Sequence, residues 1–179
     1  MNPIYIVLII VAVVIFWVIY VSNKLNKLIV KIDESLSGID VALTKRYDVL
    51  TKMIEVVKGY AKHEKETLFE VVKLRDNMSL KEKSDANQVM DENFKKINVL
   101  VENYPELKAS ENYKTLQLSI SDVEEHLQAA RRLYNSNVSL YNQQIVIFPN
   151  SLVAGAKGMG KRDFFEAESS KKEDVKIEL

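Results

Sequence analysis

The hydrophobic pattern of the chain begins with a segment that is apolar on every side of any helix it could form. Residues 4–21 carry no charged side chain, and a helix of that length rises about 27 Å, close to the thickness of the hydrocarbon core of a bilayer. Trp17 and Tyr20 come near the far end, where amphipathic rings favour the lipid headgroups. The segment from Ile4 to Val21 is therefore predicted to span a membrane.

The flanks of this segment favour a permanent anchor over a cleaved signal peptide. No Lys or Arg precedes it, and it lacks the Ala-x-Ala pattern at which a signal peptide is cut. Lys24, Lys27 and Lys31 follow it, and basic flanks tend to remain in the cytoplasm. We expect a single-pass membrane protein with a short external N-terminus and a cytoplasmic C-terminal domain.

Beyond the anchor, apolar residues recur every eleven positions. The repeat consists of Leu28, Ile39, Leu50, Ala61 and Val72. Eleven residues in three turns need almost no supercoil. The pattern predicts one nearly straight helix from Lys24 to about Asp76, roughly 80 Å long. A bend near Thr51, which would divide this helix in two, stays open.

Two further helices are predicted by their end signals. Ser79 and Glu82 fit a capping box, with Ser84 or Asp85 as another possible start. The second helix should run to about Asn103, because a proline follows at position 105. A third helix is expected from Ser110 to the residue before Pro149.

The third helix carries a heptad repeat, which is typical of a helix that packs along another helix. One seam consists of Tyr113, Ile120, Leu127, Tyr134, Tyr141 and Phe148, and the other of Leu116, Val123, Ala130 and the polar Asn137. The predicted fold is all-α: an N-terminal transmembrane helix that continues into a long-helix antiparallel bundle. It has three long helices, or four if the first one bends.

Composition supports this division and excludes some functions. The 25 basic and 25 acidic side chains cancel, which argues against a nucleic-acid-binding protein. We divide the chain into an anchor (1–23), a cytoplasmic helical bundle (24–149), a Gly-containing C-terminal segment (150–167) and a charged, disordered tail (168–179).

Catalytic and metal-binding patterns are not found. The chain has no cysteine nucleophile, and neither His63 nor His126 has the second ligand of a zinc or di-metal helix motif. No Gly-rich phosphate loop opens a helix. We therefore expect no enzyme activity, no cofactor, no metal and no small-molecule substrate.

A Tyr-Asn pair that recurs after seven residues suggests a polar network. The candidate members are Arg46, Tyr47, Asp48, Arg131, Tyr134, Asn135, Tyr141 and Asn142. Buried tyrosine and asparagine fix helix register by hydrogen bonding. The network could lie inside one chain or form a surface shared between protomers.

A length argument favours the shared surface. A second helix of about 20 to 28 residues returns only 30 to 40 Å, roughly, toward the membrane, and the third then rises about 58 Å. Residues from Ala130 onward would then be left without a partner over about 15 to 30 Å, and an amphipathic helix does not stay unpaired in water. Either the first helix bends near Thr51 to make four shorter helices, or homo-oligomerisation through residues 134–148 covers them.

Several stretches together resemble the LemA family of bacterial membrane proteins. They are residues 39–40, 43–48 (LTKRYD), 56–64 (VVKGYAKHE), 104–109 (YPELKA), 130–135 (ARRLYN), 148–149 and 164–167 (FFEA). Thr51 and Lys52 depart from the family, which often has proline and asparagine there. The resemblance implies one span, a cytoplasmic helical bundle of the four-helix class, and no established catalysis.

From the residues and the resemblance together we expect a membrane-anchored helical scaffold. It would self-associate at the inner face of a bacterial plasma membrane. The alternative is an adaptor or regulator of an integral membrane enzyme such as a protease, because family members often lie near membrane-protease genes. The expected partners are the membrane, a second copy of the chain and another integral membrane protein.

Overall fold

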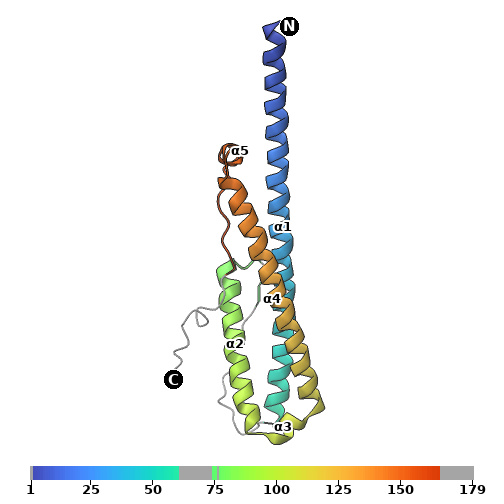
Figure 1. The fold of residues 1–179 in the computed structure, drawn as a ribbon. Coiled ribbons are helices and arrows are strands. Elements are labelled where there is room, and N and C mark those ends of the chain that lie inside the picture. The colour runs from blue at the N-terminus through green and yellow to red at the C-terminus, as the bar shows by residue number, and fades with distance from the viewer. Residues whose placement is uncertain (1, 61–73, 76, 166–179) are drawn as a thin grey trace, which may run out of the picture. The chain divides into compact units, whose positions relative to one another are not determined.

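A computed structural model describes residues 2–60, 74–75 and 77–165 of the chain. It contains helices α1 (Pro3–Tyr60), α2 (Leu80–Glu102), α3 (Pro105–Ala109), α4 (Glu111–Val146) and α5 (Asn150–Ala156) (Figure 1). No strand is found in these three ranges. The predicted all-α helical bundle is confirmed. The predicted tail, His63 and the repeat positions Ala61 and Val72 lie outside the described residues.

The first helix continues out of the apolar segment without interruption. α1 has 58 residues and passes Thr51, whose hydroxyl donates to the main-chain oxygen of Tyr47 at 2.9 Å. Of the two forms left open by the sequence, the structure has the one with three long helices. The prediction that α1 extends to about Asp76 is wrong for Leu74 and Arg75, which are not helical.

The start of α2 confirms the capping box at Ser79. The Ser79 hydroxyl accepts from the amide of Glu82 at 3.2 Å, and the Glu82 carboxylate accepts from the amide of Ser79 at 2.7 Å. These bonds satisfy amides that the first turn of a helix leaves free. They also hold the pKa of Glu82 below its ordinary value, because the Ser79 main-chain N–H stabilises the charged form.

The described chain divides into two compact units. Unit 1 consists of Met1–Ser37 and Arg132–Phe164, and unit 2 of Gly38–Arg131 with the residues from Phe165 onward. Both α1 and α4 contribute to each unit.

In unit 1, the buried apolar positions of α1 and α4 follow the same spacing of four, three and four residues. They are Val21, Leu25, Leu28 and Ile32 on α1, and Tyr134, Val138, Tyr141 and Ile145 on α4. This is the spacing of helices that pack lengthwise. Asn137 adds a polar cross-link, since its amide donates to the Lys31 main-chain oxygen at 3.1 Å and to the Ser35 hydroxyl at 3.2 Å.

In unit 2, the contacts show how the helices run. Asp40 pairs with Lys83, and Arg46 contacts Asn87, so α1 and α2 run in the same direction. Arg46 also pairs with Glu124, while Gly38 faces Ala130, so α4 runs antiparallel to α1. The expectation of antiparallel neighbours therefore holds for α4 against α1 and fails for α2 against α1.

The parallel course of α1 and α2 contradicts the premise of the length argument. The second helix was expected to return toward the membrane, but α2 runs the same way as α1 and α4 alone makes the return. The part of α4 from Ala130 onward is covered by its own chain, because Tyr134, Val138 and Tyr141 are buried in unit 1.

The heptad seam predicted for the third helix ends before its last position. Tyr113, Leu127, Tyr134 and Tyr141 are buried as expected, but Phe148 is 76% exposed. α4 ends at Val146, and Phe148 then precedes Pro149 through a cis peptide bond. Because Phe148 lies beyond the end of α4, the heptad period of the helix does not place its side chain on the seam. The short helices α3 and α5, which bracket α4, were not predicted.

Candidate functional site

A buried arginine forms the polar centre of unit 2. Arg46 of α1 is 3% exposed. Its guanidinium pairs with Asp91 of α2 and Glu124 of α4, and donates to the side chain of Asn87 and, at 3.2 Å, to its main-chain oxygen. The Phe94 ring lies 5.3 Å from the guanidinium carbon. One side chain thus connects three helices.

The chemistry of this Arg46 centre is structural. A guanidinium keeps its proton at every pH a protein meets, so it cannot act as an acid or a base. Its charge is compensated by two carboxylates whose side chains are partly buried. Breaking a buried pair of this kind leaves an uncompensated charge. We interpret the Arg46 centre as a lock on the register of α1, α2 and α4 within unit 2.

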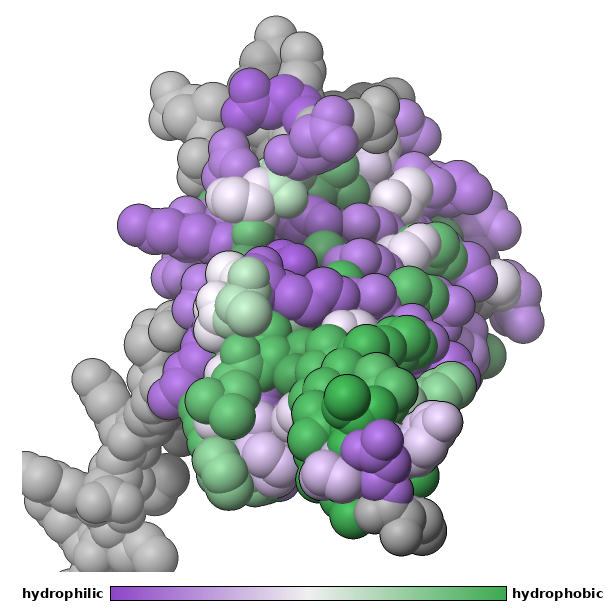
Figure 2. All heavy atoms as spheres, turned by 90° about the horizontal axis from the view of Figure 1, so that it is seen from above, coloured by the Kyte–Doolittle hydropathy of each residue, from purple (hydrophilic) through white to green (hydrophobic). Residues whose placement is uncertain are grey.

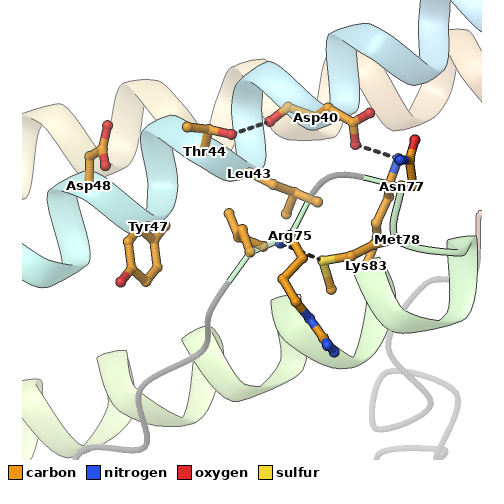
Figure 3. Close-up of a pocket in the computed structure, with 10 residues that line it drawn as sticks. Asp40, Leu43, Thr44, Tyr47, Asp48, Arg75, Asn77, Met78 and Lys83 are labelled. Atoms are coloured by element: carbon orange, nitrogen blue, oxygen red, sulfur yellow. Dashed lines mark hydrogen bonds and ion pairs between the residues drawn. The ribbon is translucent and has the colours of Figure 1, made fainter.

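A cavity of about 790 Å³ lies in unit 2 (Figure 3). Its lining is mixed and includes Asp40, Leu43, Thr44, Tyr47, Asp48, Arg75, Asn77, Met78 and Lys83. The Lys83 Nζ and a carboxylate oxygen of Asp40 are 2.6 Å apart and point toward each other (Figure 3). This ion pair compensates two of the charges in the lining, and Asp48 and Arg75 add one charge of each sign.

No described part of the chain assembles a recognisable metal site. Among residues 2–60, 74–75 and 77–165, no three His, Cys, Asp or Glu side chains are placed to hold a metal ion. His126 is exposed, with its Nδ1 2.8 Å from the main-chain oxygen of Asp122 one turn earlier.

The Tyr-Asn stripe of α4 contacts the segment that follows α5. Tyr134 donates to the main-chain oxygen of Asp163 and Tyr141 to that of Gly160, both at 3.1 Å. Asn142 makes two bonds to the backbone of Arg162, donating to its oxygen at 2.8 Å and accepting from its amide at 2.9 Å. We call Tyr134, Tyr141 and Asn142 the clasp. It holds residues 160–163 along α4.

The clasp is formed by neutral groups. Burial raises the pKa of Tyr134, and the nearby charge of Arg162 opposes this rise only in part. Tyr134 therefore stays protonated and donates its hydrogen bond at physiological pH.

The structure distributes the eight predicted network residues over several places. Tyr134, Tyr141 and Asn142 form the clasp of unit 1, and Asn135 is half-buried beside them on α4. In unit 2, Tyr47 and Asp48 line the cavity, and the Arg131 guanidinium lies 5.1 Å from the centre of the Phe165 ring.

Sequence reasoning missed the partners of Arg46. A weak signal was present on α2, where Lys83 and Asn87 recur at helical spacing among Ala86 and Met90, and all four are buried. Polar residues that continue an apolar stripe can indicate buried ion pairs.

A second seam, on the outside of α4, was also missed. Leu133, Ser136, Leu140 and Gln143 follow a spacing of three, four and three residues, and all are exposed. Leu133 is 57% and Leu140 44% exposed. We call these four residues the outer seam. It lies one residue away from the buried Tyr134 and Tyr141 and the half-buried Asn137, so two heptad patterns overlap in one stretch of sequence.

The apolar segment of α1 is not part of the core. Within the described residues α1 is the one helix long and apolar enough to cross a membrane, and 6% of its most apolar stretch is buried. A core helix would be largely buried.

Comparison with known proteins identifies the family. A model of the LemA family matches residues 35–179. The chain belongs to the LemA family. This LemA-family chain is 30% identical over 169 residues to protein LemA of Metamycoplasma hominis, covering 90% of the chain and 77% of that protein. It is 28% identical over 67 residues to magnetosome proteins MamQ 1 and MamQ 2 of Paramagnetospirillum magneticum, covering 37% of the chain and 25% of each relative.

The family and the apolar helix together fit a membrane protein. LemA is not a known enzyme family. The family model matches from residue 35 onward, so the apolar segment and the part of α1 next to it lie outside the matched region. The interpretation of this segment as a membrane span is based on its length and hydropathy.

Proposed function

We propose that this chain is a non-catalytic interaction protein, anchored by α1 at the inner face of a bacterial plasma membrane, that assembles with a second copy through the outer seam of α4. The single observation that carries the proposal is the outer seam itself. It combines the heptad spacing of a helix interface with exposed leucines, on a face of α4 that the described part of the chain leaves uncovered.

The anchor is supported by the change in burial along α1. The large apolar side chains before Val21 are mostly exposed, whereas Val21 itself is 2% exposed and Leu25 is buried. Exposed apolar residues over a bilayer's thickness require a lipid environment. Lys24, Lys27 and Lys31 follow at once, which favours a cytoplasmic location for the remainder.

Self-association follows from the geometry of the anchor and the seam. Two copies in one membrane enter it in the same orientation, so their α4 helices run parallel about a two-fold axis. In that arrangement each seam residue meets its own counterpart. Ser136 and Gln143, which alternate with the leucines along the seam, are polar, and polar residues at such positions fix the register of a helix pair.

The opposite face of α4 is already used within the chain. Tyr134, Tyr141 and Asn142 bind residues 160–163, and Asn137 binds α1. The surface between protomers is therefore proposed at Leu133 and Leu140 and not at the Tyr-Asn stripe.

Light scattering of the full-length protein in detergent tests the proposal. We expect a defined oligomer, and a shift to the monomer when both Leu133→Gln and Leu140→Gln are introduced. Leu118→Gln is the matched control, since Leu118 is 73% exposed on α4 outside the outer seam. A wild-type monomer would contradict self-association. If position 140 of such a monomer could be crosslinked to an integral membrane enzyme, the adaptor function would replace self-association as the proposed function.

A further inference from the structure

The end of α4 and the start of α5 present large apolar side chains to the outside of unit 1. Val146, Ile147, Phe148 and Leu152 are all exposed. We call these four residues the apex. On the other side of α5, Val153 and Ala154 are buried in unit 1. The short helix is thus fixed to its unit by one face, while the adjacent turn and Leu152 point away from the core.

The apex lies at the level where α1 leaves the membrane. Lys157, which caps α5, donates from its Nζ to the side chain of Asn26 on α1 at 3.3 Å. Asn26 lies five residues after Val21, a rise of about 7.5 Å along a helix. The membrane-spanning segment and the apex therefore belong to the same end of unit 1, as Figure 1 shows for α5 and the upper part of α1.

The view from above, onto the N-terminal end of α1, shows hydrophobic side chains gathered over part of this face with hydrophilic ones beside them (Figure 2). Four large apolar residues within seven positions are unusual on a surface that faces water. At the edge of a bilayer, the same residues can enter the boundary between headgroups and acyl chains.

The charges around the apex fit the same environment. No Asp or Glu occurs in residues 1–32 or 126–162. Unit 1 as a whole carries seven basic and three acidic side chains. Lys157, Lys161 and Lys24 are among the basic ones. A basic, acid-poor surface next to an apolar turn matches a membrane with anionic headgroups.

From this combination we infer that the apex is a second membrane contact: Phe148 and Leu152 insert into the interfacial layer of the bilayer that α1 crosses, with the neighbouring lysines on anionic headgroups. The two contacts would hold unit 1 against the membrane at two points and restrict rotation about α1. The inference rests on the anchoring by α1 that the proposed function includes.

Single labels can test this, because the chain has no cysteine. Leu152→Cys, Val11→Cys and Leu118→Cys would each be spin-labelled in the full-length protein, reconstituted in vesicles of phosphatidylcholine with phosphatidylglycerol. The measurement compares collisions with oxygen, which dissolves in lipid, and with a water-soluble nickel chelate. We expect an oxygen-to-nickel ratio at Leu152 several-fold above that at Leu118 and below that at Val11 in the span.

The outcomes separate the inference from the anchor. A label at Leu152 that behaves like the one at Leu118 would overturn the apex contact while leaving the anchor intact. A label shielded from both reagents would mean that protein, such as a second copy, covers the apex, and would also overturn it. A water-exposed label at Val11 would overturn the anchor itself. Phe148→Cys gives an independent second position with the same expected ratio.

Lipid composition tests the electrostatic part. In vesicles of phosphatidylcholine alone, the ratio at Leu152 should fall, whereas the ratio at Val11 should not change. Lys157→Gln together with Lys161→Gln should cause the same fall in the mixed vesicles. An unchanged ratio in both experiments would contradict the role of anionic headgroups.

Discussion

The two units of this chain use different kinds of polar contact. Unit 2 places charged side chains against one another, with Arg46 between Asp91 and Glu124 and Lys83 beside Asp40. Unit 1 relies on neutral side chains that bind the main chain, as in the clasp and at Asn137. The charge balance differs as well: of the 25 basic and 25 acidic side chains, unit 1 has seven and three, which leaves 18 and 22 for unit 2.

We interpret this difference as a division of roles: unit 1 positions the chain at the membrane, and unit 2 fixes the register of its helices. The basic, acid-poor unit contains the apolar anchor, so its charge suits an anionic membrane surface. The more acidic unit has its register set by buried ion pairs, which specify partners because an unmatched charge is costly. Substitutions at the Arg46 ion pairs of unit 2 should therefore have larger effects than substitutions at the neutral contacts of unit 1.

The largest effect is expected at Arg46. Arg46→Met keeps the apolar stem but leaves Asp91 and Glu124 without their shared cation, so the free energy of unfolding should fall by about 3 kcal/mol. Urea denaturation of the full-length protein in detergent, followed by circular dichroism, measures it. Arg132→Met, at an exposed position of α4, is the control and should change stability little. Equal effects at both positions would remove the distinction between the units.

A smaller and more local effect is expected at the clasp. Asn142→Ala removes both bonds to Arg162 and should lower stability by roughly 1 to 2 kcal/mol. The amide of Arg162, which donates to Asn142, should exchange with deuterium several-fold faster. Gln128→Ala, at an exposed position of α4 in unit 2, should leave that amide unaffected. Unchanged exchange at Arg162 in the Asn142 variant would mean that other contacts hold residues 160–163.

The cap of α2 gives the next effect. Ser79→Ala should cost about 1 kcal/mol, because the amide of Glu82 loses its acceptor. Ser84→Ala is the control, since Ser84 was the other possible cap and lies inside α2. The pKa of Glu82 is lowered in the folded state, so its stabilisation is present above its ordinary value of 4.5 and is lost as the pH falls through its folded value. The Ser79 main chain causes most of this lowering and the Ser79 side chain adds to it, and Ser79→Ala removes the side-chain part. Denaturation at pH 7 and pH 3 should therefore show a smaller Ser79→Ala effect at pH 3.

The smallest effects are expected at two tyrosines and only in alkaline solution. Burial raises the pKa of Tyr134 in unit 1 and of Tyr113 in unit 2. A raised pKa means that stability is complete below the ordinary value of 10 and falls as the pH rises past it. Tyr134→Phe and Tyr113→Phe should each flatten this fall in thermal unfolding between pH 9 and pH 11.

Much of the fold could be predicted because its signals are local. The uncharged segment from Ile4, the Ser79 capping box and Pro105 each act through neighbouring residues, and the structure has helices that begin or end as they indicate. The heptad of α4 placed Tyr134 and Tyr141 on a helix-packing seam for the same reason, and both are buried. It failed at Phe148, because a repeat says nothing about where the helix stops.

The parts that could not be predicted depend on the tertiary arrangement. Asn87 and Asp91 are ordinary helical residues until the parallel course of α1 and α2 brings them to Arg46, and Glu124 is one until the antiparallel α4 does the same. The clasp binds main-chain atoms of residues 160–163, and these atoms are present whatever the side chains are, so the sequence of this segment carries no signal for the contact. The outer seam was hidden because the buried seam occupies the adjacent residues.

Disulfide crosslinking in isolated membranes tests the proposed assembly most directly. With no native cysteine, Leu140→Cys in the full-length protein reports only contacts of its own position. A parallel pair of α4 helices predicts that oxidation converts most of the Leu140→Cys protein, and the Leu133→Cys protein, into a covalent dimer, while Leu118→Cys stays monomeric. Equal dimer yield at all three positions, or none at Leu140 and Leu133, would contradict self-association through the outer seam.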